Sequence, residues 1–221
     1  NASDEECDLH WHMLHDCCFD GAEDSLWKRA VSMAVHERKV LAPDPTDLFL
    51  HVCVHGAAYN PMPPIRWIAD AATIVRSAGD RMDWTRLVAD ADERLLSLVM
   101  REAVRTLRLV ADVDVPDSAI ALFDSARVSA IERHEYSQRI VDQNYLRTIS
   151  GRWCQLHRQY RYVNPVARIA KIPSFMQKIW SIPSKRALPG IVAFRVIPAY
   201  ARNIRSRYTG GGAVRTGTGE S

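Results

Sequence analysis

The sequence predicts a mainly α-helical protein, a multi-helix bundle with a small N-terminal α/β remnant of one to three short strands. Three observations predict this fold: apolar residues recur at helical spacing over residues 44–150, period-2 alternation occurs only near the N-terminus, and prolines divide the rest into short pieces. Of the 221 residues, 47% are hydrophobic and 25% are charged, which excludes a wholly disordered or low-complexity protein.

Residues 1–43 carry the strand signals. Apolar and polar side chains alternate over residues 7–13, as in a half-buried strand. A short helix is expected over residues 26–31. The alternation from Met33 to Leu41, around a charged centre, predicts a small hairpin.

Residues 44–150 are expected to form a helical domain. Pro45, beside Asp44, opens a helix that is apolar almost all round and ends near Gly56, so this helix should be central. The prolines of residues 61–64 then force a bend, and Gly79 ends the next helix. The later helices are expected over residues 65–78, 84–91, 95–110, from Pro116 onward, and 128–149.

Residues 151–208 form a basic, aromatic segment. From residue 151 to the end there are 13 Lys and Arg against one acid, Glu220, so this part carries +12 and the first 150 residues about −9. Its prolines predict short helices, and its large apolar side chains are too many for a solvated arm. We expect the segment to pack on the acidic body and residues 209–221 to be disordered.

A membrane-spanning protein and a secreted protein are not expected from this sequence. The longest charge-free stretch, residues 48–65, contains three prolines and two histidines, so no membrane-spanning helix is expected. The polar, acidic first residues do not form a secretory signal. Five cysteines without framework spacing favour the reducing cytoplasm.

Cysteine, histidine and aspartate cluster near the N-terminus. Zinc accepts such ligands, but no second ligand pair follows at the usual distance, so hydrogen-bonded histidines on a strand edge are the favoured interpretation. The cluster comprises Cys7, Asp8, His10, His12, His15, Asp16, Cys17 and Cys18.

His51 and His55 are four residues apart, so both imidazoles lie on one helix face and could share a metal ion or a phosphate. Val52 stands where a zinc protease would need its catalytic Glu, which excludes that class. Asp70, on the next helix, is a candidate partner for one histidine. The alternative is a pair of hydrogen-bonded histidines in a tight helical core, and we expect no tight zinc binding.

Three motifs, in order, resemble the uncharacterised bacterial nucleotidyltransferase-like family of the polymerase-β type. They are Asp-Leu-His-Trp at residues 8–11, the histidine helix of residues 45–57, and Ile-Arg-Trp-Ile-Ala-Asp at residues 65–70, followed by Asp83-Trp84. The resemblance covers about residues 7–200. It implies a site in which a Gly-Ser turn, an Asp-x-Asp pair and a third carboxylate hold Mg²⁺ ions on a nucleoside triphosphate.

By this resemblance, Asp8 is the third carboxylate and the catalytic residue, and His10, His51, His55 and Asp70 bind substrate. The strand that carries Asp8 and His10 should then lie close to the two histidines. No Gly-Ser pair occurs in the sequence, and the candidate carboxylates Asp80 and Asp83 follow Gly79 on helical sequence without a strand before them. No metal-binding residue is therefore predicted in this chain alone.

The chain is expected to be the C-terminal portion of a longer enzyme, as the missing initiator Met suggests, or else an inactive remnant. Mg²⁺ and a nucleoside triphosphate are expected as cofactors of the complete protein only. The acceptor, a small molecule or a protein, and the oligomeric state stay open. The competing hypothesis is a non-catalytic helical binding module for an acidic partner, with nucleic acid a less favoured partner than the chain's own acidic body.

Overall fold

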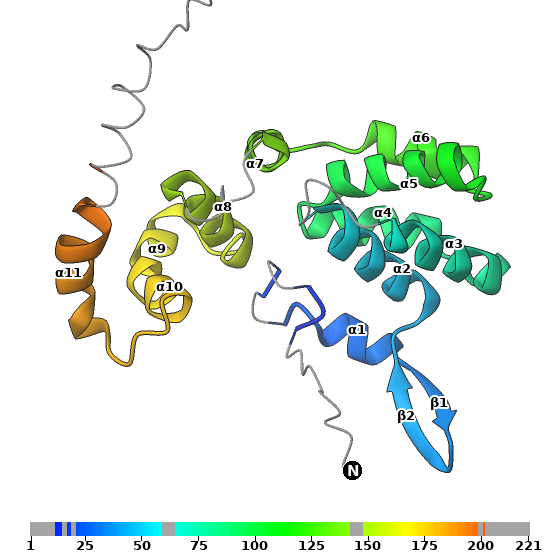
Figure 1. The fold of residues 1–221 in the computed structure, drawn as a ribbon, viewed down its shortest axis with the longest axis horizontal. Coiled ribbons are helices and arrows are strands. Elements are labelled where there is room, and N and C mark those ends of the chain that lie inside the picture. Colours follow the sequence, from blue (N-terminus) through cyan, green and yellow to red (C-terminus); the bar gives the residue numbers. More distant parts are fainter. Residues whose placement is uncertain are drawn as a thin grey trace, which may run out of the picture. The chain divides into compact units, whose positions relative to one another are not determined.

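The computed structural model describes residues 12–14, 17–18, 21–58, 65–141, 148–198 and 201 (Figure 1). These residues form eleven α-helices and a two-stranded antiparallel sheet, which confirms the predicted mainly α fold. The chain divides into two compact units, residues 1–162 and 163–221, which are described separately below.

The N-terminal elements are a short helix and a hairpin. Helix α1 (Asp24–Arg29) precedes strands β1 (Val31–Val35) and β2 (Arg38–Ala42), which pair in register with Met33 opposite Val40. The predicted short helix and hairpin are therefore confirmed. Residues 7–11 of the predicted N-terminal strand lie outside the described residues, and Met13 lies in a bend.

The helical core of the first unit begins where the Asp44-Pro45 signal places it. The Asp44 carboxylate accepts a hydrogen bond from the backbone N–H of Asp47 at 2.9 Å and so caps the first helix. The next helix ends at Gly79, which has a φ of 52° that a residue without a side chain adopts at little cost. The elements are α2 (Pro45–Cys53), the π-helix η1 (Val54–Ala58), α3 (Arg66–Ala78) and the 3₁₀-helix η2 (Gly79–Arg81).

Three further helices complete this core. They are α4 (Trp84–Glu93), α5 (Ser97–Ala111) and α6 (Asp117–Ser125), as the apolar spacing predicts. Phe49 on α2 meets the Trp84 ring edge to face, with 5.6 Å between the ring centroids. The core side chains come from all five of α2–α6, and they include Phe49, Leu50, Leu87, Met100, Val104, Leu107 and Phe123.

The prediction of one helix over residues 128–149 is wrong at the C-terminal end of that range. Helix α7 (Ala130–Val141) and helix α8 (Ile149–Gln159) are separate elements. Thr148 is extended, with a ψ of 164°, and its hydroxyl oxygen accepts a hydrogen bond from the Gly151 N–H at 3.0 Å. A threonine in that role begins a helix, so a continuous helix cannot pass through it.

The second unit consists of short elements that begin at prolines, as predicted. Pro165, Pro173 and Pro189 each stand in the first turn of a helix, where the missing N–H costs nothing. The elements are α9 (Pro165–Ala170), α10 (Ile172–Ile179), η4 (Lys185–Ala187), α11 (Leu188–Ile191) and η5 (Val192–Val196). Residues 209–221 lie outside the described residues.

No helix within the described residues is long and apolar enough to cross a membrane.

Candidate functional site

Two histidines lie together at the end of α2. The His51 and His55 ring centroids are 5.6 Å apart and their planes are inclined by 55°. Helix α2 continues past His51 into the π-helix η1, which contains His55. His51 is half-buried and His55 is exposed. The structure therefore brings the two predicted substrate-binding histidines to one place, with one ring reaching solvent.

The N-terminal segment contacts His51. The His51 Nδ1–H donates to the Met13 carbonyl, with 2.8 Å between the two heavy atoms. A carbonyl only accepts, so the proton sits on Nδ1, and in the neutral ring Nε2 has the lone pair. Met13 is in turn held by its own N–H, which donates to the Glu23 carboxylate at 2.6 Å. Asp8 precedes Met13 by five positions in the sequence, and both Asp8 and His10 lie outside the described residues.

Asp70 lies on the helix next to the histidines. Helix α3 packs against α2 and η1. The approach is closest at Gly56, where an added Cβ would lie 2.2 Å from the Cβ of Trp67. Asp70 follows Trp67 by three residues and is exposed. The structure thus places Asp70 on an element that contacts η1.

The described residues do not form a magnesium or zinc site. Within the described parts of the chain, no three His, Cys, Asp or Glu side chains gather closely enough to hold a metal ion. Mg²⁺ requires several oxygen ligands, and the carboxylates that do gather are bound to arginines. The described side chains therefore do not fit the magnesium that the family resemblance implies.

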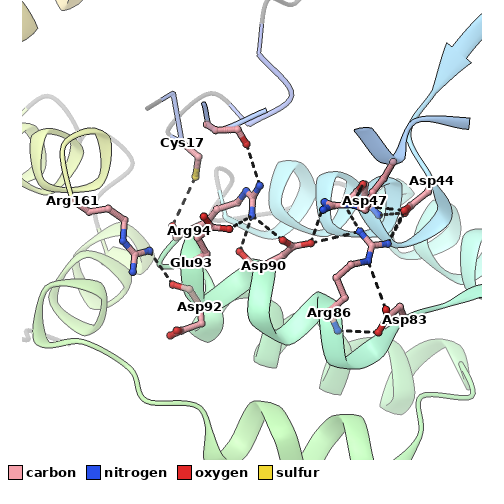
Figure 2. A network of polar contacts seen from close by, with 12 residues as sticks. Cys17, Asp44, Asp47, Asp83, Arg86, Asp90, Asp92, Glu93, Arg94 and Arg161 are labelled. Carbon is pink, nitrogen blue, oxygen red and sulfur yellow. Dashed lines mark hydrogen bonds and ion pairs between the residues drawn. The ribbon is translucent and has the colours of Figure 1, made fainter. Parts of the chain in front are cut away.

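A network of arginines and aspartates joins α1, α2 and α4 (Figure 2). Asp47 is fully buried, and both its oxygens accept hydrogen bonds from Arg29, at 2.8 and 3.0 Å. Arg86 donates to Asp47 at 2.9 Å and to Asp44 at 2.7 Å. Arg29 also lies 3.3 Å from Asp90. The network fastens the N-terminal helix α1 to the helix that carries His51.

The network shifts the pKa values of its members in different directions. Burial raises the pKa of the Asp90 carboxyl despite the neighbouring charges of Arg94 and Arg29. Burial acts on Asp44 in the same sense, but the Asp47 N–H and the Arg86 guanidinium outweigh it and hold the pKa of Asp44 below its usual value. The hydrogen bond to Asp47 raises the pKa of Arg29. These side chains act as structural ion pairs, because each carboxylate is matched by a guanidinium.

A second polar centre lies at the junction of α4 and α5. Arg158 of α8 is buried, donates to the carbonyls of Arg94 and Leu95, and pairs with Glu135 of α7 at 2.5 Å. Arg161 donates to the Asp92 carbonyl at 3.1 Å (Figure 2). The carbonyls at the end of a helix carry partial negative charge, which these cations offset. The first residues of the basic segment therefore cap α4 within the first unit.

Sequence reasoning missed both polar centres. One signal was available, because Arg86, Asp90 and Arg94 recur every four residues and so share one face of α4. Their partners could not be identified in this way. In the sequence, Asp47 follows Arg29 by 18 residues and precedes Arg86 by 39, and no local spacing rule joins positions so far apart.

The comparisons with known proteins give one match. The profile of the family described as "Uncharacterised nucleotidyltransferase" matches residues 2–112, half of the chain, which include both histidines, Asp70 and the arginine–aspartate network. No curated protein and no solved structure matches the chain. The chain therefore belongs to the uncharacterised nucleotidyltransferase family.

Proposed function

We propose that this chain is the helical, substrate-binding part of a nucleotidyltransferase, which moves a nucleoside monophosphate from a nucleoside triphosphate to an acceptor. The reaction requires a Gly-Ser turn followed by an Asp-x-Asp pair on a strand. The sequence contains no Gly-Ser pair, and an Asp-x-Asp stretch at Asp90-Ala91-Asp92 lies within helix α4, so the chain is expected to act only when joined to a segment that supplies both motifs. In this proposal Asp8 is the third carboxylate, and His10, His51, His55 and Asp70 contact the substrate. Membership of the family supports the general kind of reaction.

The observation that carries the proposal is the hydrogen bond between His51 and the Met13 carbonyl. It ties the segment that follows Asp8 and His10 to the helix face that carries both histidines. Leu14 and Cys17 are buried in the same core as α2, so this attachment extends beyond one hydrogen bond. The residues just after the N-terminal motif and the histidine motif thus lie in one compact unit.

The chemistry suits a phosphorylated substrate. Imidazole N–H groups donate hydrogen bonds to phosphate oxygens, and a protonated ring also offsets their negative charge. The exposed ring of His55 is available to solvent, and the ring of His51 is oriented by the Met13 carbonyl. A carboxylate at Asp8 would accept the proton of an acceptor hydroxyl as a general base.

Pyrophosphate release from nucleoside triphosphates tests this proposal. The assay compares the chain alone with the chain extended by whatever the gene encodes in frame before Asn1. We expect release only from an extended chain that supplies the two missing motifs, with a loss of about 100-fold or more in Asp8→Asn. His51→Ala and His55→Ala should raise the KM for the nucleotide.

The matched control is His36→Asn, which changes an exposed histidine of the hairpin whose φ of 52° asparagine also tolerates. Its kinetics should equal those of the unchanged chain. An active extended chain in which Asp8→Asn has no effect would contradict the assignment of Asp8. Unchanged KM values in both histidine variants would contradict substrate binding at the pair.

A further inference from the structure

The described residues of the second unit include cations but no acidic side chain. The sequence contains neither Asp nor Glu from residue 143 to residue 219. Within the described part of this unit, Lys171, Lys178, Lys185 and Arg186 are exposed, whereas Arg168 is buried. A surface of this kind attracts an anionic partner.

The same unit exposes large apolar side chains. It buries Phe175, Ile182 and Leu188, so its helices have apolar contacts of their own. Two pairs of apolar side chains are exposed, and the two members of each pair are three residues apart in the sequence. They are Val166 and Ile169 on α9, and Phe194 on η5 with Ile197 just after it. Val166 is 80% exposed and Phe194 is 84% exposed. Apolar groups left in water in this number indicate an interaction surface.

Charge and apolar exposure together distinguish between anionic partners. Nucleic acid offers phosphates and stacking bases, and of these four apolar residues only Phe194 could stack on a base. The aliphatic side chains of Val166, Ile169 and Ile197 make no favourable contact with a phosphate backbone. The headgroup region of a membrane accepts cations and aliphatic side chains at once.

The acidic body of the same chain is less suited to be the partner. Many of its carboxylates are already paired with arginines of the first unit. These pairs are Asp44 with Arg86, Asp47 with Arg29, Asp90 with Arg94, Asp117 with Arg108, Asp124 with Arg105 and Glu135 with Arg158. An anionic surface outside the chain offers negative charges that are not already paired with arginines of the first unit.

We propose that the second unit binds the surface of an anionic membrane, with Val166, Ile169, Phe194 and Ile197 entering the headgroup region and the exposed cations facing acidic lipids. This contact lies on one surface of the bilayer and involves no spanning helix. It does not depend on nucleotidyl transfer.

Vesicle flotation of the full chain tests this proposal. The probes are vesicles of phosphatidylcholine alone and vesicles of phosphatidylcholine and phosphatidylglycerol in equal parts. We expect binding to the anionic vesicles only, weakening as salt is added. The double variant Lys185→Gln/Arg186→Gln should bind roughly 25-fold more weakly, from about fivefold for each cation. Phe194→Gln should lose about tenfold or more, because a large apolar side chain no longer enters the lipid.

The matched control is Leu109→Gln, which changes a side chain of the first unit that is 86% exposed and should leave binding unchanged. Since all of the substituted residues are exposed, circular dichroism should show an unaltered helix content in every variant. Binding to neither vesicle would overturn the proposal, as would equal binding to both. Retained vesicle binding in Phe194→Gln, or salt-dependent binding to single-stranded RNA with no binding to vesicles, would overturn it too.

Discussion

Asp47 is the residue on which the ion-pair network depends. Its side chain is fully buried and forms ion pairs with both Arg29 and Arg86. We expect Asp47→Ala to lower the free energy of unfolding by about 3 kcal/mol, because two guanidinium groups lose their buried partner while keeping some contact with solvent. Urea denaturation measures the change.

The control for Asp47 is Asp124→Ala, which removes a carboxylate from an exposed ion pair with Arg105. Exposed pairs contribute about 0–1 kcal/mol, so the control should unfold nearly as the unchanged chain does. Equal stability of the two variants would show that the buried network does not stabilise α1 on α2 and α4.

Glu132 should make stability depend on pH. Its carboxylate is buried on α7, one oxygen accepts the Leu98 N–H at 2.8 Å, and burial raises its pKa. The folded chain therefore holds this proton to higher pH than the unfolded chain, so stability falls as pH rises from the ordinary glutamate pKa through the raised one. Glu132→Gln keeps an oxygen that accepts the Leu98 N–H but cannot titrate. This variant should therefore lose the part of the pH-dependent decrease in stability that Glu132 causes. Urea midpoints over a pH series check it, and an identical slope in both chains would contradict it.

At the residue scale, the sequence predicts local contacts and misses distant ones. The Asp44 cap joins positions three residues apart, so Asp44-Pro45 predicts it. The His51 contact with Met13 spans 38 residues, and Arg158 reaches Leu95 across 63. The pairing of His51 and His55 was predicted because both stand on one helix, whereas the arginine–aspartate pairs depend on how different helices pack.

Gly56 sets the closest approach between two elements. An added Cβ would lie 2.2 Å from the Trp67 Cβ and 2.3 Å from its Cγ, so η1 or α3 would have to move. We expect Gly56→Ala to cost about 3 kcal/mol or more in unfolding free energy, since neither a helix backbone nor a buried indole can give way cheaply. A shift of α3 should also reduce substrate binding at the histidines. Chemical denaturation with a nucleotide-binding assay measures both effects.

The control for Gly56 is Gly190→Ala, at a helical glycine where an added Cβ meets nothing within 4 Å. Alanine favours the helix by up to about 1 kcal/mol over glycine, so this variant should be as stable as the unchanged chain or slightly more so. A stable Gly56→Ala variant would mean that the two helices are not held in this contact.

At the scale of elements, helices with strong end signals were predicted well. Asp44-Pro45, Gly79 and Pro116 each mark an end that the structure confirms within one or two residues. The error over residues 128–149 arose because that stretch is polar and its apolar spacing is weak, so it shows no break. The Thr148 cap was the available signal, but threonine also occurs within helices. The π-helix η1 had no sequence signal beyond Gly56.

For the whole molecule, the charge asymmetry of the sequence has two structural consequences. The first basic residues after position 150, among them Arg158 and Arg161, cap the end of α4 inside the first unit. The exposed cations from Lys171 onward belong to the second unit. One basic segment in the sequence thus contributes both to stability and to a charged surface. For residues beyond 162, docking on the body stays a prediction.

Truncation separates these two contributions. A chain that ends after Tyr162 keeps α8, including the Arg158 hydrogen bonds to the α4–α5 junction and its ion pair with Glu135. We expect this chain to unfold at nearly the same urea concentration as the full chain, because the boundary between the compact units follows Tyr162.

A chain that ends after Thr148 should be much less stable, by about 3 kcal/mol or more, because it loses Arg158 and leaves buried Glu135 and the junction carbonyls without that partner. Arg158→Ala in the full chain should reproduce most of this loss, which separates the ion pair from the rest of α8. If removal of residues 163–221 alone destabilised the first unit as strongly, the second unit would be part of its core, and the docking prediction would replace the membrane proposal.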